Sequence, residues 1–243
     1  MQLHCGDCFD VLPSIATGSI DLVCADVPYG TTACKWDSVL DLDRMWLELY
    51  RVAKENAAIV IFSAQPFTSV LVASNFKNWK TEWIWEKPHA TGFLNAKKQP
   101  MRAHENIQVF YRKQPTYNPQ MTHGHARKTS SRGSPDTDVY GEANQFVTYD
   151  STSRYPRDVQ KFSSDKQKQS LHSTQKPVAL LRYLIETYSN PGETVLDFTM
   201  GSGTAGVACQ EASRKFIGIE KDPAIYQVAC DRTGYRNLVV SAA

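Results

Sequence analysis

Four consecutive residues near the N-terminus, Asp26-Val27-Pro28-Tyr29, follow directly on the apolar run 20–25. Such a run is typical of a buried strand in a parallel sheet, and ligands bind beyond the carboxyl ends of those strands. A carboxylate, a proline-stiffened turn and an aromatic ring suit the binding of a flat nucleobase. Asp26 and a backbone carbonyl would accept hydrogens from the exocyclic amine, and Tyr29 would stack on the ring. Taken alone, the pattern also marks ordinary turns between a strand and a loop.

An exocyclic amine is a poor nucleophile because its lone pair is delocalised into the aromatic ring. Acceptors that pull the nitrogen towards a tetrahedral shape expose that lone pair for attack on an electrophilic methyl group. The protein then has to align donor and acceptor and to place acceptors beside the charged amine that forms. The residues at 26–29 therefore predict group transfer to a base.

A second motif, Asp197-Phe198-Thr199-Met200-Gly201-Ser202-Gly203-Thr204, lies near the other end of the chain. A predicted strand over 195–198 leads into a glycine turn, and a predicted helix begins at about Thr204. Gly201 and Gly203 permit a tight turn and a close approach to a ligand, while the helix N-terminus offers N–H donors. Glu220 ends the next predicted strand, where an acidic side chain binds both ribose hydroxyls of an adenosine.

Two alternatives to an adenosine cofactor with a short tail have to be weighed for this turn. Read with Gly206, the turn also matches the G-x-G-x-x-G pattern of dinucleotide-binding domains. That pattern normally opens its domain, whereas only 23 residues follow Glu220 here, so the other strands must come from the N-terminal half. S-adenosyl-L-methionine fits this arrangement better than a nicotinamide dinucleotide. A glycine turn that serves packing alone is the other reading.

With His172-Ser173-Thr174-Gln175-Lys176-Pro177 between them, the two motifs resemble the amino DNA methyltransferases of the β class. In that family the catalytic motif precedes the cofactor motif, a circularly permuted order that accounts for the late glycine turn. The resemblance covers residues 3–222 and is weakest over 111–170. It implies methyl transfer from S-adenosyl-L-methionine to N6 of a flipped-out adenine in double-stranded DNA. Asp26 favours adenine, because cytosine-N4 members more often have serine there; cytosine N4 and an inactive DNA-binding relative are the alternatives.

The resemblance also implies roles for individual residues. The carbonyl of Val27 is the second acceptor beside Asp26, although the family usually has proline at this position. Asp7 is expected to bind the adenine amine of the cofactor, and Thr174 and Lys176 are expected to bind its methionine carboxylate. Position 173 is serine in this chain, whereas the family often has proline there. The full cofactor set is Asp7, Thr174, Lys176, Asp197, Phe198, Gly201, Ser202, Gly203, Thr204 and Glu220. A homodimer and a cognate restriction endonuclease are the other partners that the resemblance suggests.

The formal net charge of +2 is unevenly distributed along the chain. Residues 86–170 contain 14 lysines and arginines against 8 acidic residues, whereas the rest of the chain contains 13 against 17. A net positive charge over residues 86–170, with a net negative charge over the rest of the chain, indicates a polyanionic partner. We expect DNA contacts from Lys35, Trp36, Lys97, Lys98, Arg127, Lys128 and Arg132. Taken one at a time, each of these charges is better explained as a solvated surface group, and Trp36 is slightly better explained as a packed side chain; the assignment to DNA is stronger for the set than for its members. Lys87 and Glu105 are interpreted as ordinary strand residues.

These motifs require an α/β scaffold to position them. Apolar patterns predict strands over 20–25, 57–62, 79–85, 107–111, 195–198 and 216–219, and helices over 41–55, 66–76, 177–188 and 223–233 besides the one from Thr204. Their alternation predicts a doubly wound, mostly parallel sheet, the Rossmann-like methyltransferase fold in permuted order. No leucine or isoleucine occurs between Gln108 and Ser170, so this part cannot build its own core. We expect a catalytic half over 1–110, a polar target-recognition insertion over 111–170 and a cofactor-binding half over 171–243.

The composition is that of an ordinary globular chain, with 243 residues, 42% of them hydrophobic and 21% charged. No apolar run approaches the roughly 20 residues that cross a bilayer, and the N-terminus lacks the pattern of a signal peptide. Cys5 and Cys8 have no second pair or clustered histidines to complete a zinc site. We expect a cytoplasmic protein of a prokaryote or phage, with reduced thiols, no metal and no membrane partner.

Overall fold

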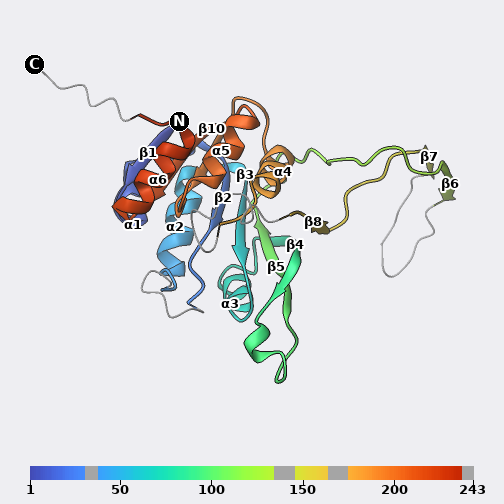
Figure 1. The fold of residues 1–243 in the computed structure, drawn as a ribbon. Helices are drawn as coiled ribbons and strands as arrows, with labels where there is room; N and C mark the ends of the chain where they lie inside the picture. The colour runs from blue at the N-terminus through green and yellow to red at the C-terminus, as the bar shows by residue number, and fades with distance from the viewer. Residues whose placement is uncertain (31–37, 134–145, 164–174, 237–243) are drawn as a thin grey trace, which may run out of the picture. The chain divides into compact units, whose positions relative to one another are not determined.

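The computed structural model describes residues 1–30, 38–133, 146–163 and 175–236. The chain forms two compact units, Met1–Asn118 with Asp158–Ala243, and Pro119–Arg157. The larger unit is built on an eight-stranded sheet in the order β1-β10-β9-β2-β3-β5-β4-β8 (Figure 1). Its strands are β1 (Gln2–Cys5), β2 (Ile20–Asp26), β3 (Ala53–Ser63), β4 (Trp79–Thr91), β5 (Arg102–Phe110), β8 (Val159–Lys161), β9 (Thr194–Asp197) and β10 (Lys215–Glu220).

Five neighbouring strands of this sheet, β1, β10, β9, β2 and β3, run parallel, whereas β5 is antiparallel to both β3 and β4. Strand β9, from the last quarter of the chain, lies between β10 and β2 in the middle of the sheet. This order confirms the predicted doubly wound, mostly parallel sheet in permuted order. Because parallel strands end at one edge, the residues that follow β1, β2, β9 and β10 all meet there.

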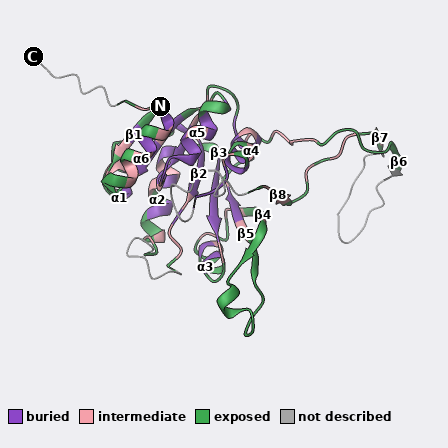
Figure 2. Ribbon diagram, in the orientation of Figure 1, coloured by how far each residue is buried: buried purple, intermediate pink, exposed green. Residues whose placement is uncertain are grey.

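Helices cover both faces of the sheet. They are α1 (Cys8–Val11), α2 (Leu42–Val52), α3 (Phe67–Ser74), α4 (Val178–Tyr188), α5 (Thr204–Glu211) and α6 (Pro223–Thr233). In β2, Leu22 and Cys24 belong to the core cluster shared with α4, α5 and α6, while Val23 and Ala25 belong to the one shared with α2 and α3. Alternate side chains of a strand point to opposite faces, so a strand covered on both sides is apolar throughout. The strands are accordingly buried along the middle of the unit (Figure 2).

The helix boundaries have local causes in the sequence. The Asp41 carboxylate accepts a hydrogen bond from the Arg44 backbone N–H at 3.0 Å and caps α2. Asp222 caps α6 in the same way, Pro223 occupies its first turn, and Gly234 ends it with a φ of 66°. These signals explain why the predicted helix over 223–233 agrees with the structure and why α2 begins at Leu42. Helix α2 ends at Val52, three residues before the predicted end, because Ala53 already begins β3.

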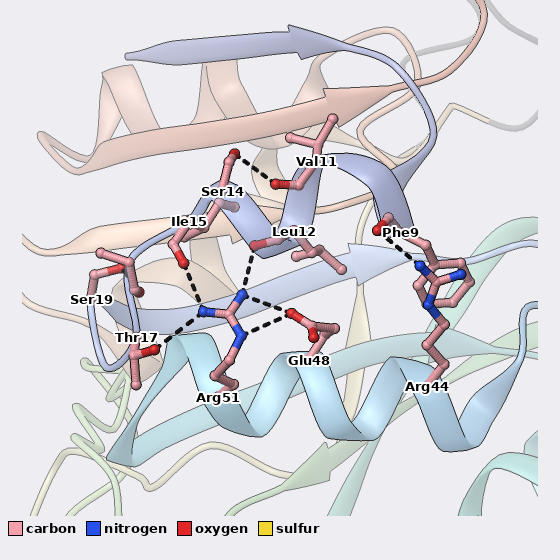
Figure 3. Close-up of polar contacts among 11 residues, drawn as sticks. Phe9, Val11, Leu12, Ser14, Ile15, Thr17, Ser19, Arg44, Glu48 and Arg51 are labelled. Atoms are coloured by element: carbon pink, nitrogen blue, oxygen red, sulfur yellow. Dashed lines mark hydrogen bonds and ion pairs between the residues drawn. The ribbon is translucent and has the colours of Figure 1, made fainter.

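Helix α2 also anchors the segment that follows β1 (Figure 3). The Arg51 guanidinium donates to the carbonyls of Ile15 and Leu12 at 2.9 and 2.7 Å, and to Glu48 on its own helix at 2.7 Å. Arg44 donates to the Phe9 carbonyl at 3.2 Å and lies 4.6 Å from the centre of its ring. Together these contacts hold the backbone just after Asp7, one of the predicted cofactor-binding residues.

The strands that the sequence patterns missed are short or polar. β1 contains only four residues, and β8, which pairs with Ile84–Glu86 of β4, only three. Strand β4 continues to Thr91, beyond the predicted range 79–85, and β5 begins at Arg102, before the predicted range 107–111. The residues in these extensions are mostly exposed. Exposed polar strands have no apolar alternation to reveal them, so only backbone pairing identifies them.

The smaller unit contains a two-stranded antiparallel sheet of β6 (Lys128–Gly133) and β7 (Phe146–Ser151). Arg154 supports this hairpin by donating to the carbonyls of Ala126, Ser151 and Ser153 at 2.6, 3.0 and 2.7 Å. The unit lies within the predicted insertion over 111–170, while residues 111–118 and 158–163 are part of the larger unit.

Among the described residues, no helix is long and apolar enough to cross a membrane. Within the same part of the chain, Cys5, Cys8, Cys24, Cys209 and Cys230 are free thiols, and no cluster of three or more histidine, cysteine or acidic side chains that could hold a metal ion occurs. Burial, followed by the nearby Asp7 carboxylate, raises the pKa of the Cys8 thiol to about 11, so this thiol is not activated.

Candidate active site

A cavity of about 900 Å³ lies at the edge of the sheet where β1, β2, β9 and β10 end. Tyr29 and Gly201, which are far apart in the sequence, both line it. Its volume is near the upper end of the range of about 300–1,000 Å³ for ligand pockets. The two motifs at opposite ends of the chain therefore form a single site.

At one end of the cavity, the Asp26 carboxylate is held from two sides. The Tyr29 hydroxyl donates to Oδ1 at 2.7 Å, and the Lys176 ammonium donates to Oδ2 at 2.5 Å. The Thr199 hydroxyl, from the glycine turn, donates to the Asp26 carbonyl at 3.2 Å. A carboxylate oxygen accepts two hydrogen bonds, so both oxygens keep acceptor capacity for a ligand amine. The carboxylate is thus oriented before any ligand arrives.

Lys176 connects Asp26 to a second carboxylate. Its ammonium lies 2.5 Å from Asp26 Oδ2 and 3.3 Å from Glu105 Oε2, and its side chain is 8% exposed. Burial alone would lower the pKa of this ammonium, but the two carboxylates outweigh that effect and raise it. Lys176 is therefore charged at neutral pH and pairs with the residue that was predicted to be catalytic.

Glu105 is a charged residue of the cavity that the sequence analysis did not assign to the site. Burial tends to raise its pKa, but the ammonium groups of Lys176 and Lys87, at 3.3 and 3.5 Å, outweigh it and lower the pKa. Both Glu105 and Lys87 line the cavity, although the sequence marked them only as strand residues. The available signal was a carboxylate two residues before the predicted strand over 107–111, because a carboxylate next to a buried strand needs a partner.

At the other end of the cavity, the Glu220 carboxylate is oriented by backbone donors. The Gly201 N–H donates to Oε2 at 3.0 Å, and the Asp222 N–H donates to Oε1 at 2.8 Å. Gly201 has a φ of 52°, which favours glycine, and it lines the cavity. Glu220 thus presents one bound and one available acceptor position on each oxygen, as the binding of two hydroxyl groups requires.

The second glycine of the turn has a different role from the first. Gly203 does not line the cavity; a Cβ at this position would lie 3.0 Å from the Cβ of Ala229 in α6. Ser202 and Thr204 do line the cavity, and the Arg232 guanidinium lies 3.1 and 2.8 Å from their hydroxyl oxygens. Gly203 therefore permits close packing of α5 on α6, while its two neighbours face the site.

Asp197, Phe198 and Asp7, three further cofactor candidates, also line the cavity. Asp197 accepts a hydrogen bond from the Thr199 N–H at 3.1 Å, yet burial raises its pKa well above the ordinary value, with a contribution from nearby Asp26. Phe198 is buried beside it. Asp7 caps α1 by accepting from the Phe9 N–H at 2.9 Å and keeps its other oxygen for a ligand. The structure thus brings eight predicted cofactor residues to one cavity: Asp7, Lys176, Asp197, Phe198, Gly201, Ser202, Thr204 and Glu220.

The catalytic candidates Val27 and Pro28 line the cavity beside Asp26 and Tyr29. The ring of Tyr29 stacks on Phe67 of α3, with centroids 5.5 Å apart, so stacking of Tyr29 on a nucleobase stays a prediction. Contact between Lys176 and a methionine carboxylate also stays a prediction, since its ammonium pairs with Asp26 and Glu105.

The DNA-binding candidates are dispersed. Lys97 and Lys98 are exposed in the larger unit, while Lys128 and Arg127 are exposed in the smaller one, where Arg127 pairs with Asp150 at 2.6 Å. Lys35, Trp36 and Thr174 lie outside the described residues, as does the side chain of Arg132. Their predicted roles therefore stay predictions.

Known proteins resemble this chain in sequence and in fold. A model of the DNA methylase family N6_N4_Mtase matches residues 20–231. The chain is 27% identical to the Type II methyltransferase M1.MboII of Moraxella bovis, over 90% of this chain and 91% of that protein. It is 30% identical to the DNA adenine methyltransferase YhdJ of Escherichia coli K12, over 88% of this chain and 76% of that protein.

Two solved structures share the fold. The M1.HpyAVI–SAM complex has a TM-score of 0.63 at 24% identity, covering 95% of this chain and 98% of that one. The cytosine-N4-specific PvuII DNA methyltransferase has a TM-score of 0.67 at 16% identity, covering 98% and 87%. The family model matches most of this chain, and the two motifs form a single cavity. The chain therefore belongs to the N6/N4 DNA methylase family.

Proposed function

We propose that this DNA methyltransferase transfers a methyl group to the exocyclic N6 of an adenine that has been flipped out of double-stranded DNA. The observation that carries the proposal is the Asp26 carboxylate, oriented by Tyr29 and Lys176 within the cavity that Glu220 also lines. An oriented acceptor in the same cavity as a carboxylate that can bind ribose hydroxyls suits transfer between a cofactor and a base amine.

Family membership makes the methyl donor S-adenosyl-L-methionine, and the residues of the cavity fit it. Glu220 has acceptor positions for two ribose hydroxyls, and Asp7 has a carboxylate oxygen for an adenine amine. Asp197 and Phe198 line the same cavity as these residues and Asp26. When bound, the cofactor supplies an electrophilic methyl group on a cationic sulfur.

The residues of the chain would act on the amine of the base. Asp26 and the carbonyl of Val27 accept its hydrogens, which draws the nitrogen towards a tetrahedral shape and exposes the lone pair. When the nitrogen gains the methyl group it becomes positively charged, and the same acceptors stabilise that charge without reorganising. Loss of one of the hydrogens that they hold, as a proton to the carboxylate and then to solvent, would leave the neutral methylated amine. Lys176 and Glu105 are positioning residues: the ammonium holds Asp26 Oδ2, and Glu105 holds the ammonium.

Adenine is the proposed base for two reasons. The family resemblance associates aspartate at position 26 with adenine and serine there with cytosine N4. The relative at 30% identity is named as an adenine methyltransferase. The PvuII enzyme, which is cytosine-specific by name, shares the fold at only 16% identity.

The test is methyl transfer to plasmid DNA from a host without adenine methylation, followed by digestion to nucleosides and mass spectrometry. We expect N6-methyldeoxyadenosine. N4-methyldeoxycytidine instead would overturn the choice of base, and the absence of both would favour a DNA-binding protein without catalysis. Sequencing the modified plasmid identifies the recognition site. A homodimer and a cognate endonuclease are further proposals, tested by sedimentation of the free protein and by a nuclease screen of the source organism.

A further inference from the structure

Beyond the sheet, β4 and β5 continue as a two-stranded arm, residues 87–105. Strand β3 pairs with β5 only as far as Asn106, and β8 pairs with β4 only as far as Glu86. Past these points the two strands pair with each other, with Thr91 opposite Arg102. Figure 1 shows the arm in green, projecting away from the sheet at its β3 side. A two-stranded ribbon of this kind fits the major groove of DNA.

The tip of the arm, residues 92–101, exposes large apolar side chains. Phe93 is 78% exposed, Leu94 98% and Met101 37%. Figure 2 shows this part of the chain as exposed throughout. Gly92, with a φ of 93°, makes the turn into the short 3-10 helix Phe93–Asn95 that presents the first two. Polar residues would make the same turn, so the exposed apolar side chains indicate a contact.

The charge of the arm identifies the chemistry of that contact. The arm contains Lys87, Lys97, Lys98 and Arg102 against a single acidic residue, Glu105, which pairs with Lys87 at the base of the arm, so its tip over 92–101 includes no aspartate or glutamate. Apolar side chains surrounded by cations match a nucleic acid, which offers base faces between phosphates. The location agrees, because Thr91 and Arg102, which flank the tip, line the cavity that contains Asp26. Phe93 lies two residues beyond Thr91, and two residues span at most about 7 Å, so the tip begins close to the cavity.

We infer that the tip is a wedge for DNA: Phe93 and Leu94 enter the base stack at the place that the target base leaves, and Lys97 and Lys98 contact the flanking phosphates. This inference rests on the proposed function, since it requires a base in the cavity. Apolar side chains inserted between base steps replace the stacking that a flipped base loses. The wedge thus favours the extruded state that the Asp26 end of the cavity receives.

The test compares methyl transfer to two duplexes that contain the recognition site found by plasmid sequencing. One duplex is fully paired, and the other has a mismatch opposite the target base, which lowers the cost of extrusion. For the variant Phe93→Ala/Leu94→Ala we expect kcat/KM to fall about 10- to 100-fold on the paired duplex and to recover most of this loss on the mismatched one. The matched control is Phe76→Ala/Leu47→Ala, whose side chains are 71% and 70% exposed elsewhere on the unit; it should behave as wild type.

A second variant separates the wedge from simple attraction. Lys97→Gln/Lys98→Gln should weaken binding to both duplexes alike and reduce the salt slope of log Kd by about 2. An equal loss of activity on both duplexes for the Phe93/Leu94 variant, or no loss, overturns the wedge. A change in the sedimentation coefficient of the Phe93/Leu94 variant would also overturn the wedge, because it would assign the tip to contacts between copies of the chain. A wild-type protein that methylates neither duplex refutes the proposed function itself, and the wedge with it.

Discussion

Replacing Glu105 by glutamine tests whether the Glu105–Lys176 ion pair positions the carboxylate of Asp26 for catalysis. At 3.3 Å and an effective dielectric constant of about 20, the attraction between Glu105 and Lys176 is about 5 kcal/mol, before the cost of desolvation. Removing one partner of a buried pair costs about 3–5 kcal/mol. Because Asp26 still neutralises Lys176 and glutamine still offers an acceptor, we expect the lower end, about 3 kcal/mol. For a chain of this length that lowers Tm by about 6–12 °C.

The effect on catalysis separates positioning from simple support of the fold. Without Glu105 the Lys176 ammonium has Asp26 as its remaining carboxylate, so it binds Asp26 Oδ2 more tightly and makes that oxygen a weaker acceptor. We expect kcat to fall about 10- to 100-fold at 25 °C, with the KM for DNA and the Kd of the cofactor unchanged. Glu105→Asp, which keeps the charge, should recover part of the loss. Methyl transfer under single-turnover conditions measures these values.

The pH dependence of stability gives an independent check. The pKa of Glu105 is lowered in the folded protein from its ordinary 4.5, so its contribution is complete above that pH and is lost as pH falls through the folded pKa. The difference in Tm between wild type and Glu105→Gln should therefore be largest at neutral pH and shrink below about pH 4.5. Glu82→Gln is the control, because the Glu82 carboxylate accepts hydrogen bonds from the amides of Asn106 and Gln108 rather than facing the cavity. A Glu105→Gln enzyme with a lower Tm but wild-type kcat would refute the positioning role.

Four further predictions concern the two ends of the cavity and the basic surface. Asp26→Ala should lower kcat by at least about 10²- to 10³-fold in a radiolabelled transfer assay while calorimetry shows cofactor binding nearly unchanged; transfer at the wild-type rate would contradict the catalytic assignment. Glu220→Ala should raise the Kd of the cofactor about 100-fold by calorimetry, because two hydrogen bonds to a charged acceptor are lost. Burial raises the pKa of Asp197, so the folded state holds a proton that the unfolded state releases, and stability falls as pH rises from the ordinary pKa towards the folded one. Asp197→Asn should therefore be more stable than wild type in urea at pH 8 without cofactor, and a less stable variant would contradict this. Finally, Kd for the recognition duplex should rise by about 10³-fold or more between 50 and 200 mM salt, and a flat dependence would exclude a large set of phosphate contacts.

Local sequence was sufficient for the two ends of the cavity. The apolar run before Asp26 and the strand, turn and helix around Gly201 depend on residues a few positions apart, so their periodicity and glycine content reveal them. The permuted order of motifs was also readable, because it is the order of the chain. Capped helices such as α6 were predictable for the same reason. The fold class followed from the alternation of these elements.

Tertiary structure alone decided which charges meet. Lys176 lies two residues before α4, Glu105 belongs to β5 and Asp26 ends β2, and nothing local to any of them indicates the other two. Their contact depends on β5 pairing with β3 and on β3 pairing with β2, a register that side-chain packing across the whole sheet selects. Gly203 shows the same limit: its motif is that of a ligand-binding turn, and only the position of α6 shows that it serves packing. Sequence thus determined which groups are available for chemistry, while long-range pairing determined their partners, since electrostatic energy depends on distance in space and not along the chain.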